Sequence, residues 1–280
     1  MIIGLIPNLD KNNAFAVVNQ VIDELHRLKQ SILVPVFYKE ALNRSEPDYR
    51  EYDSVIRDCD ILIVLGGDGT ILHAAKAAAL QNKPILGINI GRFGYMAGLE
   101  ANELSLLENL LSGDYLTEKR MLLQITYQGQ VYHALNDAVI SRGSLSRIVD
   151  IALNFNDTPV IQYRADGVII ATPTGSTAYS LSAGGPVVDP QIECILCTPV
   201  CPHSTFSRSL IFDKGGQLTI NTKASKDNKV VLTIDGEKAI QLQDDDSVLI
   251  CKSDICADFI NLNKLPFCEI LNKKLIQGIV

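Results

Sequence analysis

The stretch that decides the fold is ILIVLGGDGT, residues 61–70. Residues 61–65 are apolar throughout, which is typical of a strand in a sheet that is covered on both faces. The glycine turn at 66–69 follows, and we expect a helix to begin near Thr70. Open α/β sheets bind ligands where a parallel strand ends at such a turn. Because glycines let the backbone approach an anion closely and the first amides of a helix are free, the stretch predicts a phosphate site.

The rest of the first 118 residues repeats this alternation of short strands and helices. Further apolar runs occur at 2–6, 32–37 and 85–90. Apolar residues recur at helical spacing over 13–29, and residues 70–80 are rich in alanine. One more helix, ending at Gly113, is predicted from four leucines at helical spacing, Leu104, Leu107, Leu110 and Leu111. The pattern predicts an α/β domain with a parallel sheet over residues 1–118.

The pattern changes near residue 119. Short apolar runs then recur at 121–127, 131–135, 149–155, 160–163, 217–222 and 229–234. Clusters of turn-forming residues separate them, at Gln128-Gly129, Asn156-Asp157 and Lys226-Asp227-Asn228. This spacing predicts a mainly antiparallel β-sandwich or open barrel over residues 119–263. The tail from Pro266 could form a last helix, with Phe267, Ile270 and Leu271 on one side.

Composition limits the function but names no chemistry. The 280 residues are 47% hydrophobic and 20% charged, enough for packed cores. The net charge is −7, and the basic residues are scattered, so we expect no nucleic-acid partner. The first residues show neither a basic leader nor a long apolar run, so we expect a cytoplasmic protein without a membrane anchor. Seven irregularly spaced cysteines indicate buried thiols in a reducing compartment.

Asp68 distinguishes the glycine turn from the two common phosphate loops. A Walker loop needs Lys before its Ser or Thr, and a dinucleotide fingerprint needs a glycine where Leu72 stands. A carboxylate in an anion-binding turn repels phosphate unless it binds the accompanying Mg²⁺ or accepts a proton from the attacking hydroxyl. The alternative is a plain Asp-Gly turn that caps the next helix.

A second group of polar residues begins at Arg164-Ala165-Asp166 and continues through 172–180 to Ser182. Six hydroxyl side chains fall in the nine residues 172–180. Such a segment suits a sugar or a ribose better than an apolar ligand, although a helix cap in a loop explains it as well. Asn136-Asp137, at the end of a predicted strand, is by itself more typical of a turn than of a site.

Four motifs in this order resemble the NAD kinase family, at 66–70, 136–137, 174–180 and 198–203. The resemblance covers about residues 60–236. It implies a kinase that transfers the γ-phosphate of ATP, or a phosphate of polyphosphate, to the 2′-hydroxyl of the adenosine ribose of NAD. It also implies an N-terminal α/β domain that the tail 264–280 rejoins, a C-terminal β-sandwich domain, and a homodimer or homotetramer.

The resemblance assigns roles to residues of this chain. Asp68 would be the general base, and Mg²⁺ or another divalent cation would accompany ATP, with Asp68 as a candidate ligand. The phosphate-binding residues would be Gly66, Gly67, Gly69 and Thr70. The NAD-binding residues would be Asp68, Gly69, Phe93, Asn136, Asp137, Arg164, Asp166, Ser176, Thr177, Ala178, Tyr179 and Ser182. Asp137 stands where the family usually has Glu, and a cation at Arg164 would favour oxidised NAD over NADH.

Several features have simpler explanations. Cys194, Cys197, Cys201 and His203 resemble metal ligands, but Cys194 and Cys197 would point to opposite faces of one strand. Asp235-Gly236 predicts a hairpin turn, although the family has an acidic residue near the site here, and residues 244–246 predict a solvated turn.

Two rival functions remain open at this point. One is a kinase with a lipid or sugar acceptor; the lack of a predicted membrane-binding helix disfavours a lipid, and the hydroxyl-rich segment 172–180 favours a ribose. The other is a non-catalytic NAD sensor, in which Asp68 would have no role in turnover.

Overall fold

The computed structural model describes residues 1–11, 13–91, 94–143, 148–203, 208–223, 229–244 and 246–277. The chain divides into two compact units, one formed by Met1–Lys119 with Cys256–Val280 and the other by Arg120–Ile255. Among the described residues, no helix is long and apolar enough to cross a membrane.

The main sheet of the first unit is parallel. Its strands are β1 Ile2–Pro7, β2 Ser31–Pro35, β3 Asp48–Arg50, β4 Ile61–Gly66 and β5 Ile85–Asn89. They follow the order β5-β4-β1-β2-β3, and each of these neighbours pairs in parallel. A short strand, β6 Leu99–Glu100, pairs with β5 in the same sense. β4 is buried along its whole length, and the parallel α/β architecture predicted from its apolar run is confirmed.

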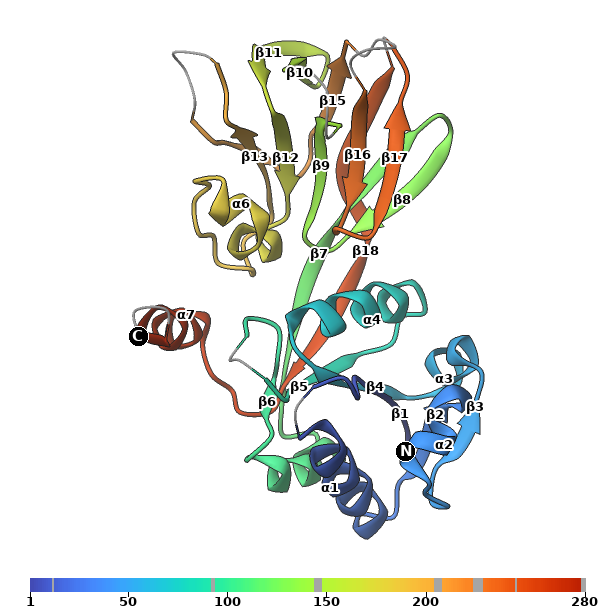
Figure 1. The fold of residues 1–280 in the computed structure, drawn as a ribbon. Helices are drawn as coiled ribbons and strands as arrows, with labels where there is room; N and C mark the ends of the chain where they lie inside the picture. The colour runs from blue at the N-terminus through green and yellow to red at the C-terminus, as the bar shows by residue number, and fades with distance from the viewer. Residues whose placement is uncertain are drawn as a thin grey trace. The chain divides into compact units, whose positions relative to one another are not determined.

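Helices cover both faces of this sheet, α1 on one and α3 and α4 on the other (Figure 1). Their bounds are α1 Ala14–Arg27, α3 Tyr52–Asp58 and α4 Asp68–Leu80, and a 3-10 turn Val36–Tyr38 and α2 Lys39–Leu42 follow β2. α1 buries Val18 and Ile22 against Leu5 of β1. On the other face α4 approaches β5 so closely that a Cβ at Gly87 would lie 2.6 Å from Cδ1 of Ile71. The absence of a side chain at Gly87 leaves room for Ile71.

The helix predicted from the leucines at 104–111 is present, but most of it is not an α-helix. It is a 3-10 helix, Leu104–Glu108, followed by one turn of α-helix, α5 Asn109–Ser112. Residues three apart share one side of a 3-10 helix, so Leu107 and Leu110 are buried while Leu111 is exposed. Gly113 ends the segment with φ of 72°, as predicted.

The end of the chain returns to the first unit. β18, Ser247–Asn261, pairs in parallel with β5 through Phe259 and Ile85. The C-terminal helix α7, Phe267–Gln277, buries Ile270, one of the residues predicted on its apolar side. Where the returning chain meets the loop before β6, an added Cβ at Gly98 would lie 2.0 Å from the carbonyl oxygen of Ile260.

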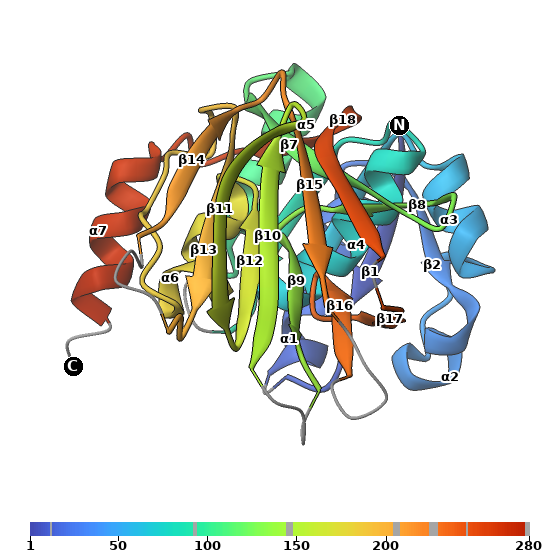
Figure 2. The same cartoon turned by 90° about the horizontal axis from the view of Figure 1, so that it is seen from above.

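The second unit consists of two antiparallel layers (Figure 2). One contains β11 Thr158–Ala165, β10 Val149–Phe155, β15 Gln217–Thr222 and the first part of β18, with the hairpin β7 Leu116–Tyr127 and β8 Gln130–Ala134. The other follows the order β14 Leu210–Asp213, β13 Cys194–Val200, β12 Gly167–Ala171, β9 Asp137–Arg142, β16 Val230–Ile234 and β17 Lys238–Leu242. One core joins the layers, with Leu153 and Ile220 from the first and Ile140 and Ile170 from the second. The predicted antiparallel β architecture is confirmed.

Tight turns join neighbouring strands of this unit where the sequence predicts them. Gln128-Gly129 and Asn156-Asp157 have positive φ at both residues, as two-residue hairpins of type I′ require. Asp235-Gly236 also has two positive φ values, in a three-residue connection between β16 and β17. The turn predicted at 226–228 lies outside the described residues.

Gly98 gives a direct test of how the returning chain packs. Replacing Gly98→Ala would press the new methyl group onto the backbone of β18, which cannot move as a flexible side chain can. We expect a loss of about 1–3 kcal/mol in the free energy of unfolding, measured by denaturant titration. Gly91→Ala is the matched control, because an added Cβ there meets open space. Equal stability of the two variants would contradict this packing.

Candidate functional site

The glycine turn lies between β4 and α4. α4 begins at Asp68, two residues earlier than predicted, so the carboxylate belongs to the first helical turn. Gly67 is the N-cap and has no side chain to cap the helix, and the first N–H groups of a helix have no acceptor within it. An added Cβ at Gly67 or Gly69 would meet open space, so packing does not explain these two glycines. Because glycine has no side chain, the first N–H groups of α4 have no side-chain cap at Gly67.

Backbone N–H groups from a later loop hold the Asp68 carboxylate. Tyr95 donates its N–H to both carboxylate oxygens, at 3.1 and 3.0 Å, and Met96 donates to Oδ1 at 3.2 Å. Gly94 permits this approach, since a Cβ there would lie 2.1 Å from Oδ1 of Asp68. The carboxylate is therefore fixed in direction while remaining partly exposed. Phe93, predicted to line the same place, lies outside the described residues.

The first unit has a pocket of about 450 Å³ at the ends of β1 and β4. A volume of this size is typical of sites that bind small ligands. β1 leads through α1 to β2, whereas β4 leads through α4 to β5 on the other side. The connections therefore diverge here, which makes this the switch point where open α/β sheets bind ligands. We call it the switch-point pocket. Its lining residues are Ile6, Pro7, Asn8, Leu9, Asp10, Tyr38, Tyr52, Gly69, Thr70, His73 and Ala74.

A hydrogen bond ties the two loops of this pocket together. The side-chain amide of Asn8 donates to Oγ1 of Thr70 at 2.9 Å, and the Asn8 N–H donates to the Leu65 carbonyl. The same Thr70 side chain occupies the space where Gly66 would carry a Cβ. Thr70 therefore positions the turn, beside the phosphate-binding role that we predict for it.

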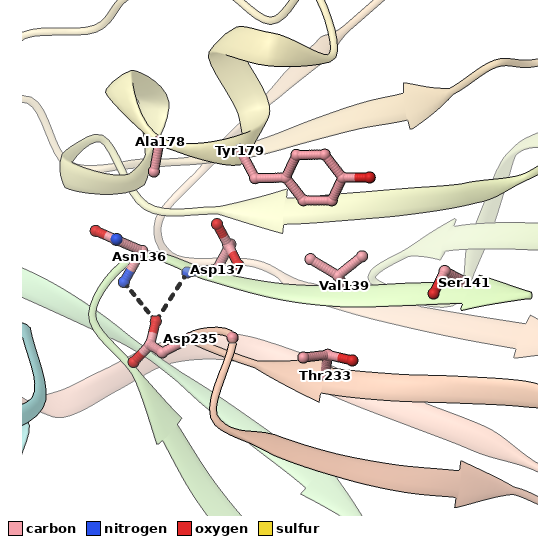
Figure 3. A pocket seen from close by; sticks show the side chains of 9 residues that line it. Asn136, Asp137, Val139, Ser141, Ala178, Tyr179, Thr233 and Asp235 are labelled. Atoms are coloured by element: carbon pink, nitrogen blue, oxygen red, sulfur yellow. Dashed lines mark hydrogen bonds between the residues drawn. The ribbon is translucent and has the colours of Figure 1, made fainter. Parts of the chain in front are cut away.

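The second unit has a pocket of about 380 Å³ at the start of β9 (Figure 3). It is lined by Asn136, Asp137, Val139, Ser141, Ala178, Tyr179, Thr233, Asp235 and Gly236. The Tyr179 side chain extends over Val139, and Asn136 lies at one end beneath Ala178. The structure thus brings four of the predicted NAD-binding residues together with Asp235.

Asp235 is a buried acceptor for three consecutive N–H groups. Leu135 donates to Oδ2 at 2.9 Å, and Asn136 and Asp137 donate to Oδ1 at 2.8 and 3.1 Å. Burial, and then the charge of Asp235, raise the pKa of the Asp137 carboxyl to about 7. Oδ1 of Asn136 is buried and has no hydrogen-bond partner in the described part of the chain. Asp235 therefore shapes the pocket, and Asn136 and Asp137 line it.

The hydroxyl groups of 172–180 serve mainly the protein itself. Thr172 donates to the Leu135 carbonyl at 2.5 Å, and Ser176 exchanges hydrogen bonds with the backbone of Val188. Within the 3-10 turn Thr174–Thr177, the Thr177 hydroxyl donates to the Thr174 carbonyl. The expectation that the six hydroxyls face a sugar is therefore too simple, because most of them hold the segment in place.

The same segment is docked against Asn136. A Cβ at Gly175 would lie 2.1 Å from the Asn136 carbonyl oxygen, so the turn fits only with glycine. This contact fixes Ala178 and Tyr179, at the start of α6 Tyr179–Ser182, over the pocket. Ser176, Thr177 and Ser182 do not line the pocket themselves.

Arg164 and Asp166 do not line this pocket, although Asp166 is next to Gly167, which pairs with the lining residue Ser141. Ala171 of β12 faces Asp137, so Asp166 is five residues, or roughly 16 Å, further along the strand. Asp166 pairs with Arg142 at 2.8 Å, and the exposed Arg164 pairs with Asp150 at 3.2 Å. The structure does not bring these two predicted residues together with Asn136 and Asp137.

Cys194 and Cys197 lie on opposite faces of β13, in different apolar clusters, as predicted. Among the described residues, no group of three or more His, Cys, Asp or Glu side chains could hold a metal ion.

Sequence reasoning missed the residues that position Asp68. Tyr95 and Met96 act through their N–H groups, which every residue except proline carries, so their side chains gave no signal. Gly94 was a usable signal, since a glycine after a short strand often marks a close approach of the backbone. Asn8 was a second usable signal, because its side-chain amide directly follows a buried strand.

Comparison with known proteins identifies the family. Two family models match, the ATP-NAD kinase N-terminal domain over residues 3–115 and the ATP-NAD kinase C-terminal domain over 135–262. An NAD kinase of Symbiobacterium thermophilum is 39% identical over 280 residues, covering 97% of this chain and 98% of its own length. An NAD kinase of Acetivibrio thermocellus is 35% identical over 279 residues, covering 98% and 96%.

Solved structures agree. The structure of yeast NADH kinase with NADH is similar with a TM-score of 0.81 and 26% identity, over 93% of this chain and 83% of that one. The NAD kinase of Archaeoglobus fulgidus in complex with ATP shares the fold, with a TM-score of 0.75 and 24% identity over 92% and 93%. Since relatives match over nearly the full length and both domain models match in order, this chain belongs to the NAD kinase family.

Proposed function

We propose that this chain transfers the γ-phosphoryl group of ATP to the 2′-hydroxyl of the adenosine ribose of NAD, which yields NADP and ADP. Family membership supports the reaction, because relatives that match over nearly their whole length are named NAD kinases. The observation that carries the proposal is the Asp68 carboxylate, held by backbone N–H groups beside a bare helix start. Phosphoryl transfer to a hydroxyl needs a proton acceptor and a phosphate cradle, and these features could supply both.

In this proposal Asp68 is the general base. The N–H groups of Tyr95 and Met96 fix its direction, and because Oδ1 accepts two of these hydrogen bonds and Oδ2 only one, Oδ2 keeps a lone pair for a further partner. The 2′-hydroxyl gives its proton to Asp68 as its oxygen bonds to the γ-phosphorus, and the bond from that phosphorus to the β-phosphate oxygen breaks. A fixed acceptor needs little reorganisation during the step.

The phosphate groups would lie against the start of α4. Gly66, Gly67, Gly69 and Thr70 are the residues that we propose to hold them, with the open space at Gly67 and Gly69 as support. The N–H groups there are donors, and the helix dipole favours negative charge.

A divalent cation would accompany ATP. Asp68 is the side chain that we propose as its protein ligand. Such an ion would neutralise charge that develops on the phosphate oxygens.

NAD would occupy the pocket of the second unit. The unpaired Oδ1 of Asn136 can accept a hydrogen bond, the Asp137 carboxyl can bind ribose hydroxyls, and the exposed Tyr179 ring can cover a planar group. Ser176, Thr177 and Ser182 would act through the segment that carries Ala178.

Arg164 and Asp166 fit a contact with NAD bound to a neighbouring subunit, since they lie at the other end of β12. The proposal therefore includes a homodimer or homotetramer, and a cytoplasmic location. Sedimentation analysis of the purified chain would measure the first of these.

Asp68→Asn tests the general base. Purified wild-type protein with NAD, ATP and Mg²⁺ should form NADP, measured with an NADP-specific dehydrogenase. We expect the variant to lose about 10²–10⁴-fold in kcat, because the amide cannot accept the proton, while its Kd for NAD stays similar.

Asp157→Asn is the matched control for this substitution. Asp157 is an exposed hairpin residue with φ of 63°, which asparagine tolerates, so its kinetics should stay those of the wild type. A folded wild-type protein that forms no NADP would refute the proposed function. An Asp68→Asn variant with normal kcat would refute only the role of Asp68.

The raised pKa of Asp137 predicts a pH dependence of NAD binding. Below about pH 7 the carboxyl is mostly protonated, and above it the carboxylate accepts stronger, charge-assisted hydrogen bonds from ribose hydroxyls. The Kd for NAD should therefore fall about three- to tenfold between pH 6 and pH 8, by calorimetry without ATP. Asp137→Asn cannot ionise and should flatten the profile; parallel profiles for the two proteins would contradict this role.

A further inference from the structure

The switch-point pocket has an aromatic wall. Tyr38 and Tyr52 line the pocket, and the Phe37 ring lies next to both. Ring centroids are 4.3 Å apart for Phe37 and Tyr38, and 6.5 Å apart for Phe37 and Tyr52, whose planes differ by 22°. We call these three residues the aromatic cluster. They come from two separate segments, the 3-10 turn after β2 and the first residue of α3.

Tyr38 packs against the core of the first unit, but the aromatic cluster as a whole keeps exposed surface. Phe37 is 62% exposed, and none of the three residues is buried. Exposed aromatic groups beside a pocket are more typical of ligand recognition than of stability. Tyr38 and Tyr52 line the same pocket as Gly69 and Thr70, which belong to the turn where we place the phosphates.

The charges of the pocket disfavour a bare polyanion. Among the described lining residues there is no lysine or arginine, and Asp10 contributes a negative charge. A chain of inorganic phosphates binds only through its anionic oxygens, so it would meet the helix start and then Asp10. A nucleotide offers more here, because its ribose hydroxyls can donate to a carboxylate and its base can stack on a ring.

We propose that the aromatic cluster binds the purine base of the phosphoryl donor, so that the donor is a purine nucleoside triphosphate rather than inorganic polyphosphate. This inference rests on the proposed function, whose donor it specifies. The base lies against the Tyr52 and Phe37 rings, the ribose lies near Asp10, and the triphosphate leads to the glycine turn. Stacking tolerates different bases, so ATP and GTP should both serve as donors.

Donor kinetics test the aromatic cluster. With saturating NAD and Mg²⁺, the wild type should use ATP with a kcat/KM at least about tenfold above that for inorganic tripolyphosphate. Phe37→Ala and Tyr52→Leu should each raise the KM for ATP about tenfold, because the stacking surface is lost. The KM for NAD, and the rate with tripolyphosphate, should stay within about twofold of the wild type.

Two controls separate stacking from folding. Tyr52→Phe keeps the ring and should keep the KM for ATP, whereas Tyr52→Leu keeps only the apolar bulk. Ile211→Ala removes an apolar side chain that is 56% exposed in the second unit and should change no kinetic constant. Thermal melting, followed by circular dichroism, should show that all four variants remain folded.

The outcomes are distinguishable from those of the proposed function. An unchanged KM for ATP in folded Phe37→Ala and Tyr52→Leu would overturn this inference while NADP formation stands. Equal use of tripolyphosphate and ATP by the wild type would overturn it too. If no donor gives NADP, calorimetry can compare MgATP binding to the wild type and to Tyr52→Leu. Equal affinities would refute binding of the base by the aromatic cluster.

Discussion

The hydrogen bonds from Tyr95 and Met96 to the Asp68 carboxylate are the constraint on which the phosphate side of the site depends. A carboxylate in the first turn of a helix is favoured by the dipole, but nothing in the helix fixes where it points. The loop after β5 supplies that direction, because β5 pairs beside β4 with Asn89 opposite Gly66. The parallel register of two buried strands therefore determines the position of the Asp68 carboxylate, and Gly94 allows the final approach.

In the second unit, backbone N–H groups also hold a carboxylate, but this carboxylate is buried. Asp235 also accepts hydrogen bonds from consecutive N–H groups, but it is buried, with 7% of its surface exposed. In this low-dielectric place its charge adds to the burial that raises the pKa of Asp137. Asp68 remains partly exposed and keeps room for a ligand. Burial thus separates a carboxylate that organises a pocket, Asp235, from one that stays accessible to solvent, Asp68.

The fold was readable from the sequence where one local rule acts alone. The uniformly apolar run before Gly66 predicts a strand covered on both faces, and Asn156-Asp157 predicts a turn with positive φ. The site was readable only in part, because its other determinants come from packing. Tyr95 and Met96 bind Asp68 through their backbone N–H groups, so their side chains could not predict this contact. The exposure of Phe37 likewise depends on which segments surround it.

The segment 172–180 shows why residue type alone does not define a binding surface. Its hydroxyl content suggested a sugar site, yet Thr172 and Ser176 bind the backbone of their own unit. What the segment provides is position, since Gly175 lets it lie against Asn136 and carry Tyr179 over the pocket. Glycine turns like the one at Asp68 occur in kinases with lipid or sugar acceptors as well. In the proposed function, selection of the acceptor would fall to residues that line the pocket of the second unit, Asn136 and Asp137 foremost among them.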